Sequence, residues 1–187
     1  MDASTRQKLF LALLNPQYDA FVRYVHAMVR NTEDARDIVG ETLLIAFEHF
    51  DEIREKDSFL FYLITIAKRL HWKTAKRRRR QLPLERKHED LQIDHGASPD
   101  LSPDIAALYT AIDRLPMRLR EALVLFELTG LRLEEIRRIQ GGTLSGVKSR
   151  VARARKKLAR MLGADIPEEI IRRQPHTSEP VNIETEG

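Results

Sequence analysis

Seven lysines and arginines, and no acidic residue, lie between positions 143 and 160, and such a run of cations suits a polyanion. On a helical wheel three of these cations point away from an apolar stripe, together with Ser145 and Ser149, and three others lie beside the stripe. Small polar side chains near the start of a helix can reach base edges, and the cations behind them suit phosphates. The candidate residues for binding duplex DNA are Thr143, Ser145, Lys148, Ser149, Arg150, Arg153, Arg155 and Lys156. A solvated amphipathic helix is the alternative, but solvated surfaces normally mix both signs of charge.

Two helices joined by a tight turn must position these side chains. Residues 131–140 carry apolar side chains at helical spacing, and the pair Gly141-Gly142 can take the positive φ angles that a sharp turn needs. Thr143 is the expected N-cap of the second helix. The apolar stripe of that helix consists of Leu144, Val147, Val151, Ala154, Leu158 and Met161. This pattern is typical of a helix-turn-helix, whose second helix enters the major groove of DNA.

A second basic strip, residues 68–80, holds eight lysines and arginines, again without an acid. Aromatic rings accompany its first cations, and this mixture suits unpaired bases, because rings stack on bases while cations hold phosphates. The candidate residues for binding unpaired bases are Lys68, Arg69, His71, Trp72, Lys73, Lys76 and Arg77. Each ring taken alone is more often part of a core. The basic run at 76–80 also resembles a nuclear localisation signal, but it continues an amphipathic helix.

The two basic strips stand out against an acidic chain. They hold 15 of the 32 lysines and arginines, and the rest of the chain has 17 basic against 28 acidic residues. An acidic body with two basic strips indicates nucleic acid that is contacted at two places, rather than a generally adhesive protein.

No arrangement of residues indicates catalysis. The six histidines, at positions 26, 49, 71, 88, 95 and 176, are scattered, and the HExxH, GxSxG and glycine-rich phosphate-loop motifs are absent. The chain has no cysteine, which excludes disulfides and thiolate metal sites and permits a reducing compartment. We therefore expect no enzyme, no cofactor and no metal. The first apolar run is too short for a signal peptide or a membrane span, so we expect a cytoplasmic protein without membrane insertion.

The apolar periodicity is helical throughout and predicts an all-α fold with two small domains. The expected division is a helical bundle at 1–81, an acidic linker at 82–103, a helix-turn-helix domain at 104–162, and a disordered tail at 163–187. Residues 82–104 hold six acids against two lysines and arginines, without helical periodicity. In the first domain we expect one helix to stop before Pro16 and another to start near it and bury Tyr18. Thr32 is the expected cap of the next helix.

Two stretches resemble one family. Residues 33–43, EDARDIVGETL, and residues 58–80, SFLFYLITIAKRLHWKTAKRRRR, resemble the second conserved region of bacterial RNA polymerase sigma factors. Residues 111–158, with AIDRLPMRLREALVLFELTGLRLEEI and GVKSRVARARKKL, resemble the fourth region. Only these two regions are present, joined by a short acidic linker. That arrangement is similar to the extracytoplasmic-function group of the sigma-70 family, the smallest sigma factors.

The resemblance implies a protein that binds core RNA polymerase and directs it to promoter DNA for transcription initiation. It implies that residues 68–80 open and hold the minus-ten element, and that residues 143–155 read the minus-thirty-five element as duplex. The linker would run through the active-centre and RNA-exit region of the polymerase. An anti-sigma factor is a further expected partner. The residues that would dock on the polymerase clamp are Asp37, Gly40, Glu41 and Thr42.

Five positions depart from the pattern of the family. Gly40 stands where a glutamine is common, and Arg69 stands where an asparagine is common. Within the helix-turn-helix, Arg137, Gln140 and Gly142 replace a small residue and two apolar ones. From these three replacements we expect a looser turn than usual.

Two other functions fit the residues without the resemblance. A stand-alone helix-turn-helix regulator would bind an operator without polymerase and would use the first 80 residues for sensing or dimerisation. An RNA-binding or antitermination protein would use the basic and aromatic helix. Tight specific DNA binding by the isolated chain favours a regulator, whereas binding to core polymerase favours a sigma factor.

Overall fold

The computed structural model of the chain describes residues 2–29, 31–53, 58–81 and 103–163. Throughout these ranges the regular structure is helical, with no strand. The expected linker, apart from Pro103, and the expected tail, apart from Gly163, lie outside the described residues. The acidic character of the linker is therefore a property of the sequence only.

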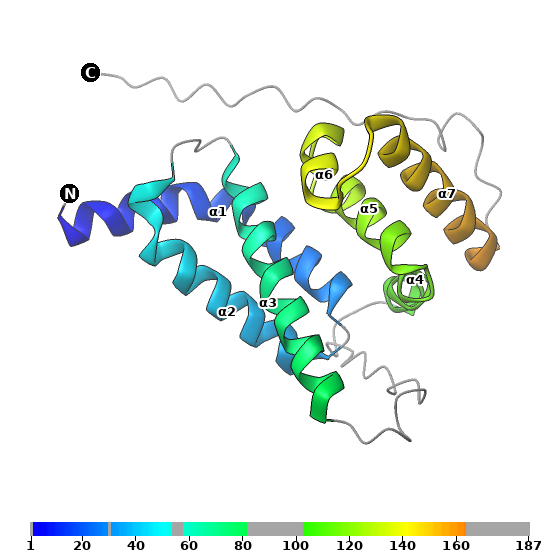
Figure 1. Cartoon of the computed structure of the whole chain (residues 1–187), viewed down its shortest axis with the longest axis horizontal. Helices are drawn as coiled ribbons and strands as arrows, with labels where there is room; N and C mark the ends of the chain where they lie inside the picture. Colours follow the sequence, from blue (N-terminus) through cyan, green and yellow to red (C-terminus); the bar gives the residue numbers. More distant parts are fainter. Residues whose placement is uncertain (1, 30, 54–57, 82–102, 164–187) are drawn as a thin grey trace.

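The helices fall into two groups that follow each other along the chain (Figure 1). The N-terminal domain consists of α1 (Ala3–Met28), α2 (Thr32–Glu48), the short 3-10 helix η1 (Phe50–Glu52) and α3 (Phe59–Gln81). The C-terminal domain consists of α4 (Pro103–Asp113), α5 (Met117–Glu127), α6 (Leu133–Gln140) and α7 (Leu144–Leu162). The predicted all-α fold with two helical domains is confirmed.

An aromatic cluster fixes the direction in which α3 leaves the N-terminal domain. The ring of Phe10 on α1 meets the rings of Phe47, Phe50 and Phe59 edge-on, at centroid distances of 5.2, 5.5 and 5.7 Å. Such edge-to-face contacts stabilise a core beyond the area that they bury. Arg6 adds hydrogen bonds from its guanidinium to the last carbonyls of α2, at 2.5 Å from Phe47 and 2.8 Å from Glu48. The start of α3 is thereby joined to α1 and to the end of α2.

α1 is continuous through Pro16, where the sequence predicted a break. Pro16 is exposed, so the carbonyl that its missing N–H leaves without a helical partner can bind water. Leu14 before the proline and Phe21 after it are both buried in the same core, which holds the two halves in one helix. Tyr18, expected in the core, is 41% exposed. The prediction of two helices was wrong because packing outweighed the local effect of proline.

The cap of α2 lies one residue earlier than expected. The side chain of Asn31, and not of Thr32, accepts a hydrogen bond at 2.9 Å from the backbone N–H of Asp34. Glu33 and Asp34 occupy the first turn, where the helix dipole favours acids.

α5 is the buried centre of the C-terminal domain. Every residue from Arg120 to Phe126 is buried, and the helix packs against α6 and α7. Arg120 forms an ion pair with Asp113 at the end of α4, and both side chains are 5% exposed. Removal of one partner from such a pair leaves a buried charge uncompensated, so the pair ties α4 firmly to α5.

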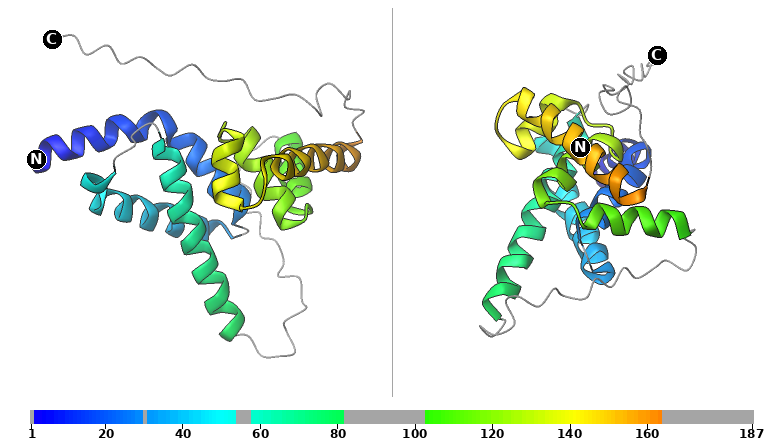
Figure 2. Two further views of the ribbon diagram at one scale, coloured as in Figure 1. Left: turned by 45° about the horizontal axis from the view of Figure 1, so that its top comes forward. Right: turned by 90° about the vertical axis from the view of Figure 1, so that its right-hand side faces the viewer.

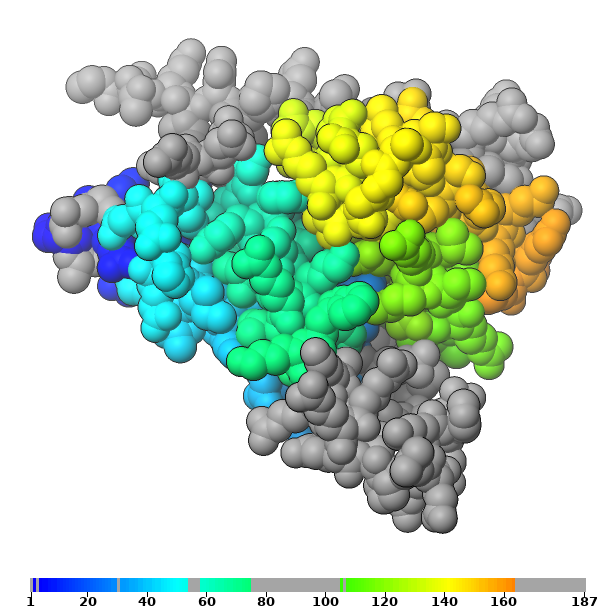
Figure 3. Space-filling view, in the orientation of Figure 1, coloured from blue at the N-terminus to red at the C-terminus, as the bar shows by residue number. Residues whose placement is uncertain are grey.

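The two domains share one core. α1 contacts both α4 and α5, and buried side chains form a continuous cluster from Phe10 on α1 to Val151 on α7. In the space-filling view, α5 and α6 lie directly against α3 (Figure 3). The C-terminal end of α3 projects away from this body (Figure 2). The domains are thus consecutive in the chain but closely packed in space.

Candidate nucleic-acid interface

The turn between α6 and α7 has the geometry that the sequence predicted. Gly141 and Gly142 have φ angles of 73° and 89°, which favour glycine. The hydroxyl of Thr143 accepts a hydrogen bond at 3.1 Å from the backbone N–H of Gly146, so its expected role as the N-cap of α7 is confirmed.

Arg137 and Gln140, from which a looser turn was expected, both make contacts within the C-terminal domain. The amide of Gln140 donates a hydrogen bond at 3.0 Å to the carbonyl oxygen of Arg118 at the start of α5. The guanidinium of Arg137 pairs with Glu134 one turn earlier on α6, at 2.8 Å. The polar replacements thus find partners inside the C-terminal domain, and the turn is held by specific hydrogen bonds.

The outer face of α7 carries most of the predicted duplex-binding residues. The residues on this face that are exposed to solvent are Thr143, Ser145, Lys148, Ser149, Arg153 and Lys156. The guanidinium of Arg153 donates a hydrogen bond to the carbonyl oxygen of Ser149 at 3.3 Å, which lays it along the helix surface. Val147, Val151 and Ala154 are buried on the opposite side, as the apolar stripe predicted. The packing of α7 therefore turns this face outward.

Two of the predicted duplex-binding arginines are engaged within the domain. Arg155 lies 2.5 Å from the carboxylate of Glu127 and stacks over the ring of Phe126, 5.0 Å from its centroid. The side chain of Arg155 is only 11% exposed. Arg150 donates a hydrogen bond at 3.2 Å to the carbonyl oxygen of Gly141 in the turn. In this structure both arginines hold α7 and its turn in place.

The basic and aromatic residues of α3 divide between solvent and the domain interface. Arg69 and Lys73 are exposed, and Trp72 is 63% exposed, an unusual position for a tryptophan. His71 is partly buried and lines a small cavity with Tyr24 and Met117, between α1, α3 and α5. The backbone of Lys76 and Arg77 belongs to α3, but their side chains lie outside the described part of the structure.

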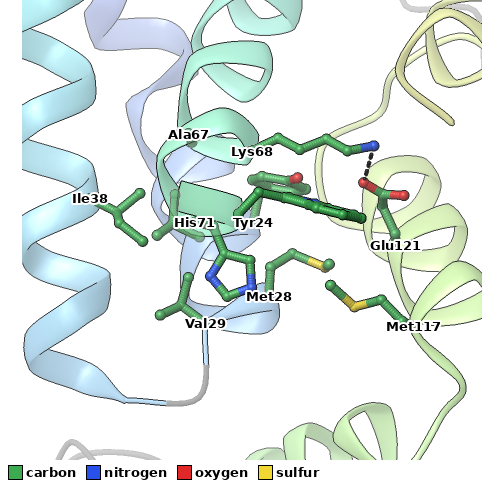
Figure 4. Close-up of a pocket in the computed structure, with 11 residues that line it drawn as sticks. Tyr24, Met28, Val29, Ile38, Ala67, Lys68, His71, Met117 and Glu121 are labelled. Carbon is green, nitrogen blue, oxygen red and sulfur yellow. Dashed lines mark ion pairs between the residues drawn. The ribbon is translucent and has the colours of Figure 1, made fainter. Parts of the chain in front are cut away.

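Lys68 faces the C-terminal domain instead of solvent. Its ammonium group lies 2.8 Å from the carboxylate of Glu121 on α5 (Figure 4). It also donates a hydrogen bond at 2.8 Å to the carbonyl oxygen of Ile139 on α6. The Lys68 side chain is 25% exposed and that of Glu121 is 10% exposed. A residue predicted to bind unpaired bases is therefore occupied by another domain of its own chain.

An open groove runs between α3 and α6 beside this ion pair. It has a volume of about 440 Å³. Its lining contains three cations and two aromatic rings but no acid, and consists of Phe61, Thr65, Lys68, Arg69, Trp72, Arg138 and Ile139. No feature of the sequence pointed to Arg138, because only the packing of α6 against α3 brings it to this groove.

The exposed face of α2 carries three of the four residues that the resemblance assigned to polymerase binding. Asp37, Gly40 and Glu41 are exposed, and a Cβ added at Gly40 would meet nothing within 4 Å. Thr42 is fully buried, so it supports the helix from within the core. Leu44 was missed, although it follows Asp37 by seven residues on the same face and is 58% exposed. α2 thus presents an open acidic face with an apolar side chain in it.

Burial perturbs the pKa values of two groups near the domain interface, His71 and Tyr24, and that of His26 elsewhere on α1. Burial lowers the pKa of His71, and the charge of Arg120 adds to this effect while Asp34 and Glu121 oppose it. Burial likewise lowers the pKa of His26 on α1. Burial, with the charge of Glu121, raises the pKa of Tyr24 far above its usual range.

The part of the chain that the structure describes contains no group of three or more histidine, cysteine, aspartate or glutamate residues that could hold a metal ion. None of its helices combines the length and the apolar character needed to cross a membrane.

A helix-turn-helix with an exposed basic face, packed against a helical domain with a basic and aromatic helix, defines a two-part DNA-binding protein of transcription. Residues 14–81 match the family model for sigma-70 region 2, and residues 105–158 match that for sigma-70 region 4. The chain is 32% identical over 141 residues to the ECF RNA polymerase sigma factor EcfG of Rhodopseudomonas palustris, covering 72% of this chain and 75% of that protein. It is 27% identical over 154 residues to the sigma factor SigV of Bacillus subtilis, covering 81% and 90%.

A solved structure has the same fold. The sigma factor RpoE of Bartonella quintana, in complex with the anti-sigma factor NepR, matches with a TM-score of 0.67 and 24% identity, over 88% of this chain and all of that one. The chain belongs to the extracytoplasmic-function group of the sigma-70 family. It is a sigma factor for transcription initiation, with a region 2 domain and a region 4 helix-turn-helix domain, and not an enzyme.

Proposed function

We propose that three separate surfaces of this sigma factor divide its work at a promoter. The acidic face of α2 binds core RNA polymerase, the exposed cations and rings of α3 hold the unpaired minus-ten strand, and the outer face of α7 reads the minus-thirty-five duplex. The observation that carries this proposal is the separation of charge: an exposed acidic face on α2, and exposed basic faces on α3 and α7. Opposite charges of this kind steer and orient partners.

The proposal gives α7 the role of duplex reader. Ser145 and Ser149 lie near the start of α7, where small side chains allow close approach to base edges. Lys148, Arg153 and Lys156 stand beside and behind them, in reach of bases and phosphates. Arg150 and Arg155 keep a place in the site as positioning residues, because their guanidinium groups are bonded within the domain.

The proposal gives α3 the role of binding unpaired bases. Trp72 is 63% exposed, and a ring that is open to solvent is available for base stacking. Arg69 and Lys73 flank it with exposed cations. Lys76 and Arg77 extend the strip along the projecting end of α3, and Arg69 in place of the common asparagine is expected to alter the preferred bases. Lys68 joins the strip once its contact with Glu121 is broken.

The proposal gives α2 the role of docking on the polymerase clamp. Asp37, Gly40 and Glu41 would form the contact, with Leu44 as its apolar centre, and Thr42 would support them from the core. Gly40 leaves open space where a longer side chain is common, so a partner can approach the backbone closely. The acidic linker would run through the active-centre region, and the chain would act in the cytoplasm, where core polymerase is found.

An anti-sigma factor is part of the same proposal. The sigma factor RpoE of Bartonella quintana was solved in complex with an anti-sigma factor, and CnrH, with a TM-score of 0.61, was solved with the cytosolic domain of CnrY. The shared fold supports the expectation of an anti-sigma partner.

Reconstitution with bacterial core polymerase tests the proposal. The chain should bind core polymerase and start transcription from a subset of a promoter library, with preferred sequences at two separated elements. Specific binding of the isolated chain to an operator, without binding to core polymerase, would contradict it and favour a stand-alone regulator.

A further inference from the structure

The carboxylate of Glu121 on α5 joins the C-terminal domain to α3 through one oxygen atom and is held within its own domain through the other. One oxygen pairs with Lys68 of α3 at 2.8 Å, and the other accepts a hydrogen bond from the amide of Gln140 at 3.0 Å. We propose that Lys68, Glu121 and Gln140 form a latch, which closes the C-terminal domain onto α3 and withholds Lys68 from DNA until a phosphate group displaces the carboxylate. The inference rests on the proposed role of α3 in binding unpaired promoter DNA.

Gln140 orients the carboxylate of Glu121 within the latch. Its amide also donates to the carbonyl oxygen of Arg118, so it is fixed against the start of α5. From there it orients the Glu121 carboxylate toward α3. An apolar residue at position 140 would leave the second carboxylate oxygen without this donor. The carbonyl of Ile139, next to Gln140, accepts a further hydrogen bond from Lys68. The end of α6 thus takes part in three of these four contacts.

The surroundings of the latch make its ion pair stronger than one at the surface. Figure 4 shows Lys68 reaching across to Glu121 above a pocket that contains Tyr24, His71 and Met117. The Glu121 side chain is only 10% exposed, and low exposure to water strengthens a charged hydrogen bond. An exposed ion pair would contribute little to holding the domains.

The latch also determines which cations of α3 are free to bind DNA. Arg69 and Lys73 point to solvent, whereas Lys68 is held by an anion of its own chain. Carboxylate and phosphate oxygens accept the same hydrogen bonds from an ammonium group. Glu121 therefore occupies Lys68 in the way that a DNA phosphate would. A backbone phosphate that enters the open groove beside Trp72 and Arg138 meets three cations and no acid in its lining, and competes for Lys68.

Distance measurement in the free protein tests the latch without any need for polymerase. The chain has no cysteine, so spin labels at Asp19→Cys on α1 and Lys157→Cys on α7, both exposed, report on the two domains without background. Glu121→Gln and Gln140→Leu should each add a population of molecules with a longer distance between the labels. In Glu121→Gln this population should be on the order of tenfold larger than in the parent protein. The matched control is Glu134→Gln, an exposed carboxylate of the same domain, and it should leave the distribution unchanged.

A charge swap separates an opened latch from a damaged fold. Lys68→Glu and Glu121→Lys should each open the domains, and the double variant should restore much of the short distance, because the ion pair is reformed with reversed charge. Circular dichroism should show the same helix content in all variants. An unchanged distance distribution in Glu121→Gln overturns the latch.

Binding of a short fluorescent single-stranded oligonucleotide tests the release step. Glu121→Gln should bind it several-fold more tightly than the parent, and Glu134→Gln should not. An opened Glu121→Gln variant whose oligonucleotide affinity is unchanged overturns the competition for Lys68. Failure of the parent chain to bind core polymerase would instead contradict the proposed function, whatever the distances show.

Discussion

Arg155 on α7 lies 2.5 Å from the carboxylate of Glu127 on α5, and this pair fastens α7 to the centre of its domain. The guanidinium also stacks over Phe126 at 5.0 Å. Arg155→Ala should therefore lower the stability of the C-terminal domain, by about 1–2 kcal/mol from the lost stacking and ion pair together. Chemical denaturation of this variant measures the loss. Arg153→Ala, an exposed neighbour, is the matched control and should leave stability nearly unchanged.

The acidic face of α2 should determine affinity for core polymerase. Asp37→Lys combined with Glu41→Lys should weaken core binding by about tenfold or more, because it places like charges against a basic partner. Leu44→Ala should weaken it further through lost apolar contact. Binding to labelled core polymerase measures both effects, with helix content as a check. Asp19→Lys on α1 is the control, and an equal loss in that variant would show that only overall charge matters.

Exposed residues of α7 and α3 should affect different steps at one promoter. Arg153→Ala should weaken recruitment by about 1–3 kcal/mol and change the preferred upstream sequence, because it removes a cation from the proposed base-reading face of α7. Trp72→Ala and Lys73→Ala should slow strand opening, since stacking on one base contributes about 1–3 kcal/mol. Permanganate footprinting on duplex and pre-melted templates separates the steps. Rescue of Arg153→Ala, but not Trp72→Ala, by a pre-melted bubble would reverse these roles.

The stability of the packed domains should fall on mild acidification. Burial lowers the pKa of His71 below its ordinary value of 6.5, so the unfolded chain takes up the proton first as the pH falls through about 6.5. The contribution of neutral His71 to the free energy of unfolding is then fully present above this pH and is lost as the pH falls below it. Asp34 of α2 and Glu121 of α5 favour the charged form, while Arg120 of α5 opposes it.

Unfolding curves between about pH 5 and 7.5 measure this dependence. His71→Gln should flatten the decline. His26 has a pKa lowered in the same direction, so the combination of His71→Gln with His26→Gln should flatten it further. If stability declined as steeply in the double variant as in the parent protein, titratable groups other than these two histidines would be responsible for the decline.

Limited proteolysis should cut first within the proposed linker, residues 82–103, and leave two resistant fragments. Because α1 packs against α4 and α5, the fragments should remain associated in a native gel. A first cut between Phe59 and Leu70 would contradict the proposed division into domains. Glu121→Gln should make the two fragments separate more readily, if the latch contributes to their association.

The sequence by itself determined the class of fold and the family. Helical periodicity depends on side chains three and four residues apart, so it is readable locally, and so are the Gly141-Gly142 turn and the Thr143 cap. The concentration of cations on two strips is likewise a property of the chain alone. These local features predicted the helix-turn-helix and its outward face correctly.

Only the tertiary structure decided which of those cations are available. Arg155 and Lys68 resemble their neighbours in the sequence, yet each meets a carboxylate from another helix, Glu127 and Glu121, that lies 28 and 53 positions away in the chain. Such partners depend on how helices pack against one another, and this packing cannot be predicted from the local spacing of residues. The same reason explains α1: Pro16 should end a helix locally, but a shared core on both sides of it keeps the helix whole. The types of residue made the two strips basic, and packing between distant helices decided which of their cations are exposed to solvent.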